Sequence, residues 1–118
     1  MDKNWQDMFD NIKNDPESQK IKEDCTGFFQ SLKNDSKEFN RQQAVKIERY
    51  VNQLASGDIT EDQCKGFLQD IADLMTIKAN EMEVSSKART QTLQKQFVAL
   101  VIGRVLPMII KALAAAVF

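Results

Sequence analysis

The chain has 118 residues, of which 28% are charged, with 4 Gly, 2 Pro, 2 Cys and no His. This length suffices for a single domain with one hydrophobic core, and the scarcity of Gly and Pro predicts an all-α fold, a bundle of four to five helices. The net charge of −1 lacks the positive excess expected of a nucleic-acid-binding protein.

The charge is unevenly distributed along the chain. Residues 1–83 hold 11 Lys and Arg against 17 Asp and Glu, a net charge of −6, whereas residues 84–118 hold the other 5 cations and no acid. We therefore divide the predicted domain into an acidic helical head, residues 1–83, and a basic hydrophobic C-terminal helix, residues 84–118.

Two helices are predicted at the start of the head. The first spans residues 4–14, where apolar side chains recur at helical spacing: Trp5, Met8, Phe9 and Ile12. The second spans residues 16–33, since Asp15 can cap a helix that Pro16 opens. Its apolar stripe consists of Ile21, Cys25, Phe28 and Leu32.

Capping residues predict the starts of the next two helices. Asp35 and Glu38 have the spacing of a capping box and predict a third helix over residues 36–56. Thr60 and Gln63 have the same spacing and predict a fourth helix over residues 61–84, which either breaks near Ser85-Ser86 or continues as an exposed helix. The apolar positions of these helices are Phe39, Ala44 or Val45, Ile47, Val51 and Leu54, and then Cys64, Leu68, Ile71, Met75 and Met82.

Two segments of the head resemble each other. Residues 25–32 and 64–71 share Cys, Gly, Phe and Gln at matching positions. If this reflects a duplication, Gly27 and Gly66 are expected to let two helices approach closely, because a glycine inside a helix otherwise costs about 1 kcal/mol. Both cysteines fall on apolar stripes, so we expect buried, reduced thiols.

The predicted fifth helix, residues 86–118, is apolar nearly all round from Phe97 onward. We expect a kink near Pro107, which cannot continue the helical hydrogen bonds. As a helix, residues 97–118 would measure about 33 Å, close to the thickness of the bilayer core. Arg104 and Lys111 lie on one side near its middle and, at roughly 2.5 to 3.5 kcal/mol each, offset most of the insertion energy of a lone helix.

Three interpretations of this helix stay open: a membrane helix, either interfacial or pore-lining; an assembly surface between copies; and the central core helix of a soluble bundle. In the first, Lys87, Arg89 and Lys95 contact anionic lipid headgroups. The residues expected to contact a membrane or other copies are Phe97, Val98, Val101, Ile102, Arg104, Val105, Leu106, Ile109, Ile110, Lys111 and Leu113.

The sequence offers no convincing catalytic or metal site. Without His it has no imidazole base and no His-containing zinc site. Asp58, Thr60 and Asp62 resemble the start of a calcium loop, but Gln63 stands where Gly is required. There is also no Gly-rich phosphate loop. We therefore expect no enzymatic activity, no cofactor, no small-molecule substrate and no nucleic acid partner.

The predicted function follows from the C-terminal helix. We expect a non-enzymatic helical protein in which this helix mediates membrane association, self-assembly or both, with pore formation as one form. The alternative is a soluble adaptor that binds a protein partner through its acidic faces, with the C-terminal helix as its core. The first 25 residues are too polar for a secretory signal, so we expect a cytoplasmic protein, including one at the cytoplasmic face of a membrane.

Overall fold

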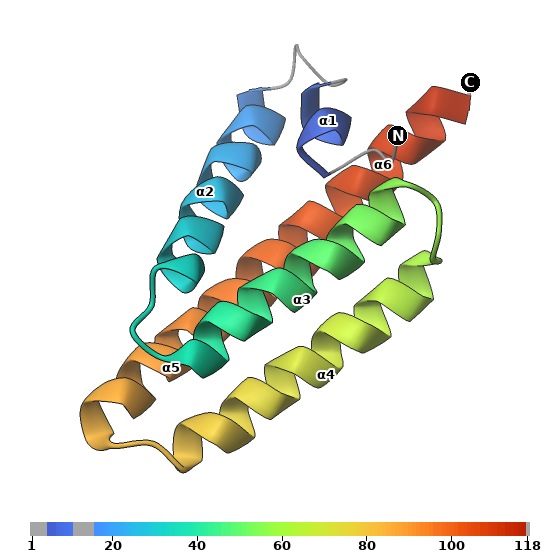
Figure 1. Cartoon of the computed structure of the whole chain (residues 1–118). Helices are drawn as coiled ribbons and strands as arrows, with labels where there is room; N and C mark the ends of the chain where they lie inside the picture. Colours follow the sequence, from blue (N-terminus) through green and yellow to red (C-terminus); the bar gives the residue numbers. More distant parts are fainter. Residues whose placement is uncertain (1–4, 11–15, 118) are drawn as a thin grey trace.

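The computed structural model of the chain describes residues 5–10 and 16–117. Its elements are the α-helices α1 (Trp5–Asp10), α2 (Pro16–Lys33), α3 (Glu38–Ala55), α4 (Glu61–Asn80) and α5 (Val84–Phe97), the π-helix η1 (Val98–Val105), and α6 (Leu106–Val117). α5, η1 and α6 follow one another without a break and form one long C-terminal helix (Figure 1). The predicted all-α fold, with a long apolar helix last, is confirmed.

The C-terminal helix is the element around which the others pack. α2 contacts α5 and η1, α3 contacts α6, and α4 contacts all three parts of the helix. The short α1 lies against α6, α2 and α3 (Figure 1). The bundle is elongated, with extents of 50 × 27 × 24 Å. Contact with every other helix makes the C-terminal helix part of the core.

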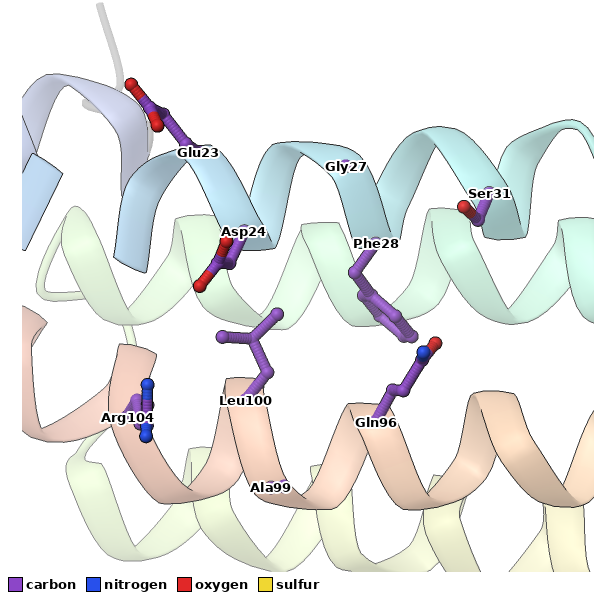
Figure 2. A pocket seen from close by; sticks show the side chains of 9 residues that line it. All are labelled: Glu23, Asp24, Gly27, Phe28, Ser31, Gln96, Ala99, Leu100 and Arg104. Atoms are coloured by element: carbon purple, nitrogen blue, oxygen red, sulfur yellow. The ribbon is translucent and has the colours of Figure 1, made fainter. Parts of the chain in front are cut away.

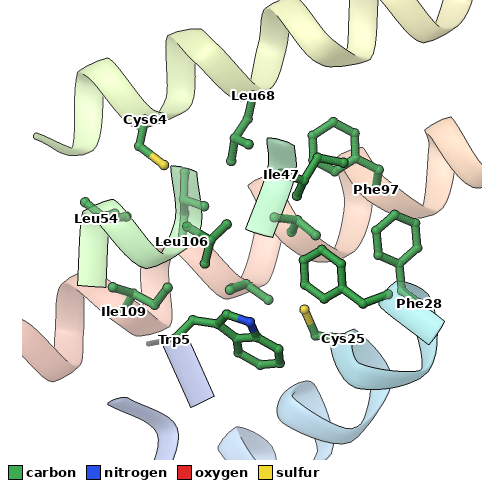
Figure 3. Packing of buried hydrophobic residues seen from close by; sticks show 14 of the residues in the cluster. Trp5, Cys25, Phe28, Ile47, Leu54, Cys64, Leu68, Phe97, Leu106 and Ile109 are labelled. Atoms are coloured by element: carbon green, nitrogen blue, oxygen red, sulfur yellow. The ribbon is translucent and has the colours of Figure 1, made fainter. Parts of the chain in front are cut away.

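One cluster of buried apolar side chains joins all the helices (Figure 3). The rings of Phe28 on α2 and Phe97 on α5 stack at a centroid distance of 6.3 Å. Trp5 on α1 lies 5.8 Å from Phe29 and 5.9 Å from Phe9, again between ring centroids. Each large side chain buried in this way stabilises the fold by about 1.5 to 3 kcal/mol. The C-terminal helix contributes Leu93, Phe97, Val101, Val105, Leu106, Ile109 and Ala112 to the cluster.

The start of α4 is the one predicted from the sequence. Thr60 Oγ1 accepts a hydrogen bond from the backbone N–H of Gln63 at 3.1 Å, and Gln63 Oε1 accepts one from the N–H of Thr60 at 2.9 Å. These two bonds form the predicted capping box. The capping box predicted at Asp35 and Glu38 is wrong, because α3 begins after Lys37 and has no side-chain cap.

Asp35 instead has a buried structural role. Its carboxylate accepts hydrogen bonds from the N–H of Lys37 at 3.0 Å and from Asn40 Nδ2 at 2.9 Å, and it forms an ion pair with Arg89 on α5. Asn40 Nδ2 also lies 3.0 Å from Thr90 Oγ1. Burial raises the pKa of Asp35, but the hydrogen bonds and the Arg89 charge outweigh this and hold the pKa below its usual value. These contacts join the α2–α3 loop to α5.

The C-terminal helix also differs in detail from the prediction. α4 ends at Asn80 and α5 begins at Val84, so the turn precedes the predicted break at Ser85-Ser86. The kink expected near Pro107 takes the form of the π-helix just before it, in which the N–H of Leu106 bonds to the carbonyl of Val101, five residues back. Because Pro107 has no N–H and its ring crowds the carbonyl four residues before it, a wider turn relieves the conflict.

The two glycines of the similar segments do not serve close helix packing within the chain. A Cβ atom added to Gly27 or Gly66 would meet no other atom within 4 Å, so the expected close approach is wrong. Cys25 and Cys64 are buried and free, as predicted, and burial raises their pKa to about 12 and about 11. The predicted Asp15 cap, residues 4 and 11–14 of the first helix, and Phe118 lie outside the described residues.

The substitution Phe97→Ala tests the role of the C-terminal helix in the core. Phe97 is 0% exposed, so we expect the free energy of unfolding to fall by about 3 to 5 kcal/mol because a large cavity remains. Val84→Ala is the matched control in the same helix: Val84 is 87% exposed, and its loss should change stability by less than about 0.5 kcal/mol. Urea unfolding followed by circular dichroism measures both. Equally small losses of unfolding free energy in the two variants would contradict the central position of the helix.

Asp35→Asn tests the buried polar cluster through its pH dependence. At pH 7 we expect a loss of about 2 kcal/mol, because hydrogen bonds to a buried carboxylate are replaced by weaker ones. Since the pKa of Asp35 is lowered in the folded state, its contribution is complete above about pH 5 and disappears as the pH falls through that folded pKa. The difference between wild type and variant should therefore shrink towards pH 2.

The control for this measurement is Asp70→Asn, which changes an exposed carboxylate on α4. Urea unfolding at several pH values should show little pH-dependent difference between this control and wild type. A constant difference between Asp35→Asn and wild type from pH 7 to pH 2 would show that the Asp35 charge does not stabilise the fold.

Candidate functional site

The C-terminal helix has a buried inner side and an exposed outer side. Of the residues predicted to contact a membrane or other copies, the buried ones are Phe97, Val101, Val105, Leu106 and Ile109. Those that lie half-buried against the core are Val98, Ile102, Ile110 and Leu113. Arg104 and Lys111 are exposed. The predicted residues therefore surround the helix and do not share one surface.

The outer side combines small or apolar residues with cations. Its exposed members between Lys95 and Ala114 are Lys95, Gln96, Ala99, Gly103, Arg104, Pro107, Lys111 and Ala114. The helix is long and apolar enough, over Val84–Ala114, to cross a bilayer, and 33% of its most apolar 18-residue window is buried. Core helices of soluble proteins also reach this length and composition. The distinctive feature of this one is an outer side with cations and no acid.

The three cations predicted to contact lipid headgroups differ in their surroundings. Lys95 is exposed and Lys87 is half-buried. Arg89 donates through Nε to Asp35, while 56% of its side chain stays exposed. This structural role of Arg89 is not visible from the sequence, because its partner lies far away in the chain and was interpreted as a capping residue.

A groove with a volume of about 580 Å³ lies between α2 and the C-terminal helix (Figure 2). Gly27, Phe28 and Ser31 line it on the α2 side, and Gln96, Ala99 and Leu100 line it on the opposite side. At one end, Asp24 on α2 points across the groove towards Arg104 on η1, whereas the neighbouring Glu23 points away from the C-terminal helix (Figure 2). Within the described part of the chain, no ion pair links Arg104 to either acid.

A second exposed feature lies between α3 and α4. The rings of Tyr50 and Phe67 stack at a centroid distance of 4.8 Å, and the Arg49 guanidinium lies 5.4 Å from the centroid of the Tyr50 ring. Phe67 is 39% exposed, although the matching position of the similar segment, Phe28, is buried. The pair borders a small hollow of about 180 Å³, also lined by Gln43, Lys46, Asp70, Ile71 and Leu74.

Metal-ligating side chains are not brought together in the described residues. There, no group of three or more His, Cys, Asp or Glu could hold a metal ion. The raised pKa values of Cys25 and Cys64 keep both thiols protonated at neutral pH, which makes them poor nucleophiles. The candidate sites are therefore surfaces: the outer side of the C-terminal helix, the groove beside α2 and the aromatic pair.

No family model matches the chain, and no curated protein and no solved structure is significantly similar to it.

Proposed function

We propose that this protein is non-enzymatic and attaches to the surface of an anionic membrane through the outer side of its C-terminal helix. The observation that carries the proposal is the combination, on one exposed helix side, of cations and small apolar residues with no acid anywhere from Val84 onward. Cationic side chains at a bilayer surface gain energy from anionic headgroups, and apolar residues between them can enter the interface.

Peripheral attachment is the form of membrane binding that preserves the fold. Phe97, Val101 and Val105 are each 0% exposed, and a helix that spanned a bilayer alone would have to leave this core. It would also separate Arg89 from Asp35, leaving a buried carboxylate without its ionic partner. Surface binding leaves both sets of contacts in place. In this proposal the protein lies at the cytoplasmic face of a membrane.

A triple variant tests the proposal; in it, all three lysines Lys87, Lys95 and Lys111 are changed to Gln. Each lysine near an anionic surface contributes about 1 kcal/mol, so the triple variant should bind vesicles about 100-fold more weakly. Co-sedimentation with phosphatidylcholine vesicles containing phosphatidylserine measures the binding, at low and high salt. Arg104 stays unchanged in this variant because it also lines the groove.

The matched control replaces three exposed lysines of the head, Lys20, Lys46 and Lys65, by Gln, which changes the net charge equally. Wild type and control should bind anionic vesicles in a salt-sensitive manner and should not bind pure phosphatidylcholine. The proposal would be overturned if the wild-type protein did not co-sediment with anionic vesicles, or if the two triple variants lost the same amount of vesicle binding. Leakage of an entrapped dye would indicate a pore and would contradict peripheral binding.

A second candidate function, binding of a protein partner by the head, is supported by the aromatic pair. Tyr and Arg are enriched among the residues that dominate binding energy in protein interfaces, and Phe is enriched in interfaces generally; Arg49, Tyr50 and Phe67 form one stacked group at the surface. The head as a whole, with a net charge of −6 over residues 1–83, would favour a basic partner.

A photo-crosslinking amino acid in place of Phe67 tests this second function in living cells. We expect one discrete crosslinked species, because a specific partner presents the same surface to position 67 in every complex. The same amino acid in place of Val84, which is 87% exposed but isolated from the pair, is the control and should give no such species. Identical crosslinking patterns at the two positions would contradict a binding role for the aromatic pair.

A further inference from the structure

The groove between α2 and the C-terminal helix presents its charges in a self-complementary arrangement. Glu23 and Asp24 lie on one wall and Arg104 on the other, and all three occupy the same end of the groove (Figure 2). The opposite end is uncharged: there Gln96 lies opposite the Phe28 ring, and Ser31 lies farther along α2 (Figure 2). Each wall therefore carries a group that the other wall could bind.

We propose that this groove is the interface of a symmetric dimer, in which a second copy of the chain packs its own groove against it. A two-fold axis running along the groove exchanges the two walls and keeps the charged ends together. Asp24 of each protomer then faces Arg104 of the other, and this contact occurs twice. An axis perpendicular to the groove would instead place each charged end against a neutral one.

The charges favour a second copy over solvent as the occupant of the groove. Within one protomer, Asp24 and Arg104 stand on opposite walls without forming an ion pair, and both side chains are exposed. In the proposed dimer each acquires an oppositely charged partner in a partly desolvated interface, where an ion pair is stronger than in water. Complementary charge on the same patch is the property that a symmetric interface requires.

The shape of the groove also suits the approach of another helix. The α2 wall has an open space at Gly27, where an added Cβ would meet no atom within 4 Å, and the opposite wall has Ala99. Phe28 and the half-buried Leu100 supply an apolar floor between the charged and neutral ends. Gly27 costs α2 about 1 kcal/mol in helix propensity and serves no contact inside the protomer. Close packing against the second protomer would explain why α2 has a glycine at this position.

Charge reversal tests the pairing directly. Sedimentation equilibrium without lipid should show a wild-type dimer. The variants Asp24→Lys and Arg104→Glu should each dimerise about 100-fold more weakly, because each places two like-charged pairs in the interface. An equimolar mixture of the two variants should form a heterodimer. In it, the lysine introduced in one variant faces the glutamate introduced in the other, while the second contact keeps the native pair of Asp24 and Arg104.

A steric pair of variants provides an independent test. Gly27→Leu should fill the groove and abolish the dimer, while the protomer keeps or gains stability because leucine is the better helix former. Gly66→Leu is the matched control: Gly66 also lies within a helix with no atom near an added Cβ, but it is outside the groove, so the dimer should persist.

Three results would overturn the inference: a wild-type protein that is monomeric at every concentration, a variant mixture that stays monomeric, or a Gly27→Leu dimer as stable as wild type. Because these measurements contain no lipid and the groove residues differ from the lysines of the vesicle experiment, failure of the dimer and failure of membrane attachment are distinguished.

Discussion

The fold depends on burial of the inner side of the C-terminal helix. Phe97, Val101, Val105 and Ile109 are each 0% exposed, and they meet side chains from the head helices in one cluster. The head cannot replace this surface, because α2, α3 and α4 direct their own apolar stripes towards the same helix. The helix therefore has two roles, one for each side: the inner side supplies the core, and only the outer side is available for a partner. Any contact that this helix makes with a membrane or a partner in the intact protein must use that outer side.

A long-range polar contact fixes where this helix begins relative to the head. Arg89 reaches Asp35 in the loop between α2 and α3, and Thr90 joins the same cluster through Asn40. A buried carboxylate is costly unless it is paired and hydrogen-bonded, so the cluster favours the arrangement in which α5 lies beside this loop. Farther along, the π-helix η1 changes the turn of the helix just before Pro107. Ala99, Leu100 and Arg104, which line the groove, all belong to η1.

Local patterns predicted the helices but not the polar contacts between distant segments. The capping box at Thr60 was predictable because both partners lie within one turn. Asp35 shows the same spacing to Glu38, yet its partners include Arg89, and no local rule ranks a distant cation above a nearby amide. Likewise, the apolar run after Phe97 indicated a membrane, an assembly or a core, because hydropathy does not specify which side of a helix meets other helices. The groove needed the relative position of α2 and η1, which the sequence does not contain.

The two proposed surfaces overlap at Gln96, Ala99 and Arg104, whereas the lysines belong to the outer side alone. Arg104 lies in the groove opposite Asp24, whereas Lys95 and Lys111 are absent from the groove lining and stay free for headgroups. The two-fold axis of the proposed dimer runs along this helix, so the outer sides of the two protomers face opposite directions and only one of them can lie against a given bilayer. The acidic head, with a net charge of −6 over residues 1–83, would be repelled by the same anionic surface. Attraction of the basic helix and repulsion of the head together orient a protomer with its outer side towards the bilayer.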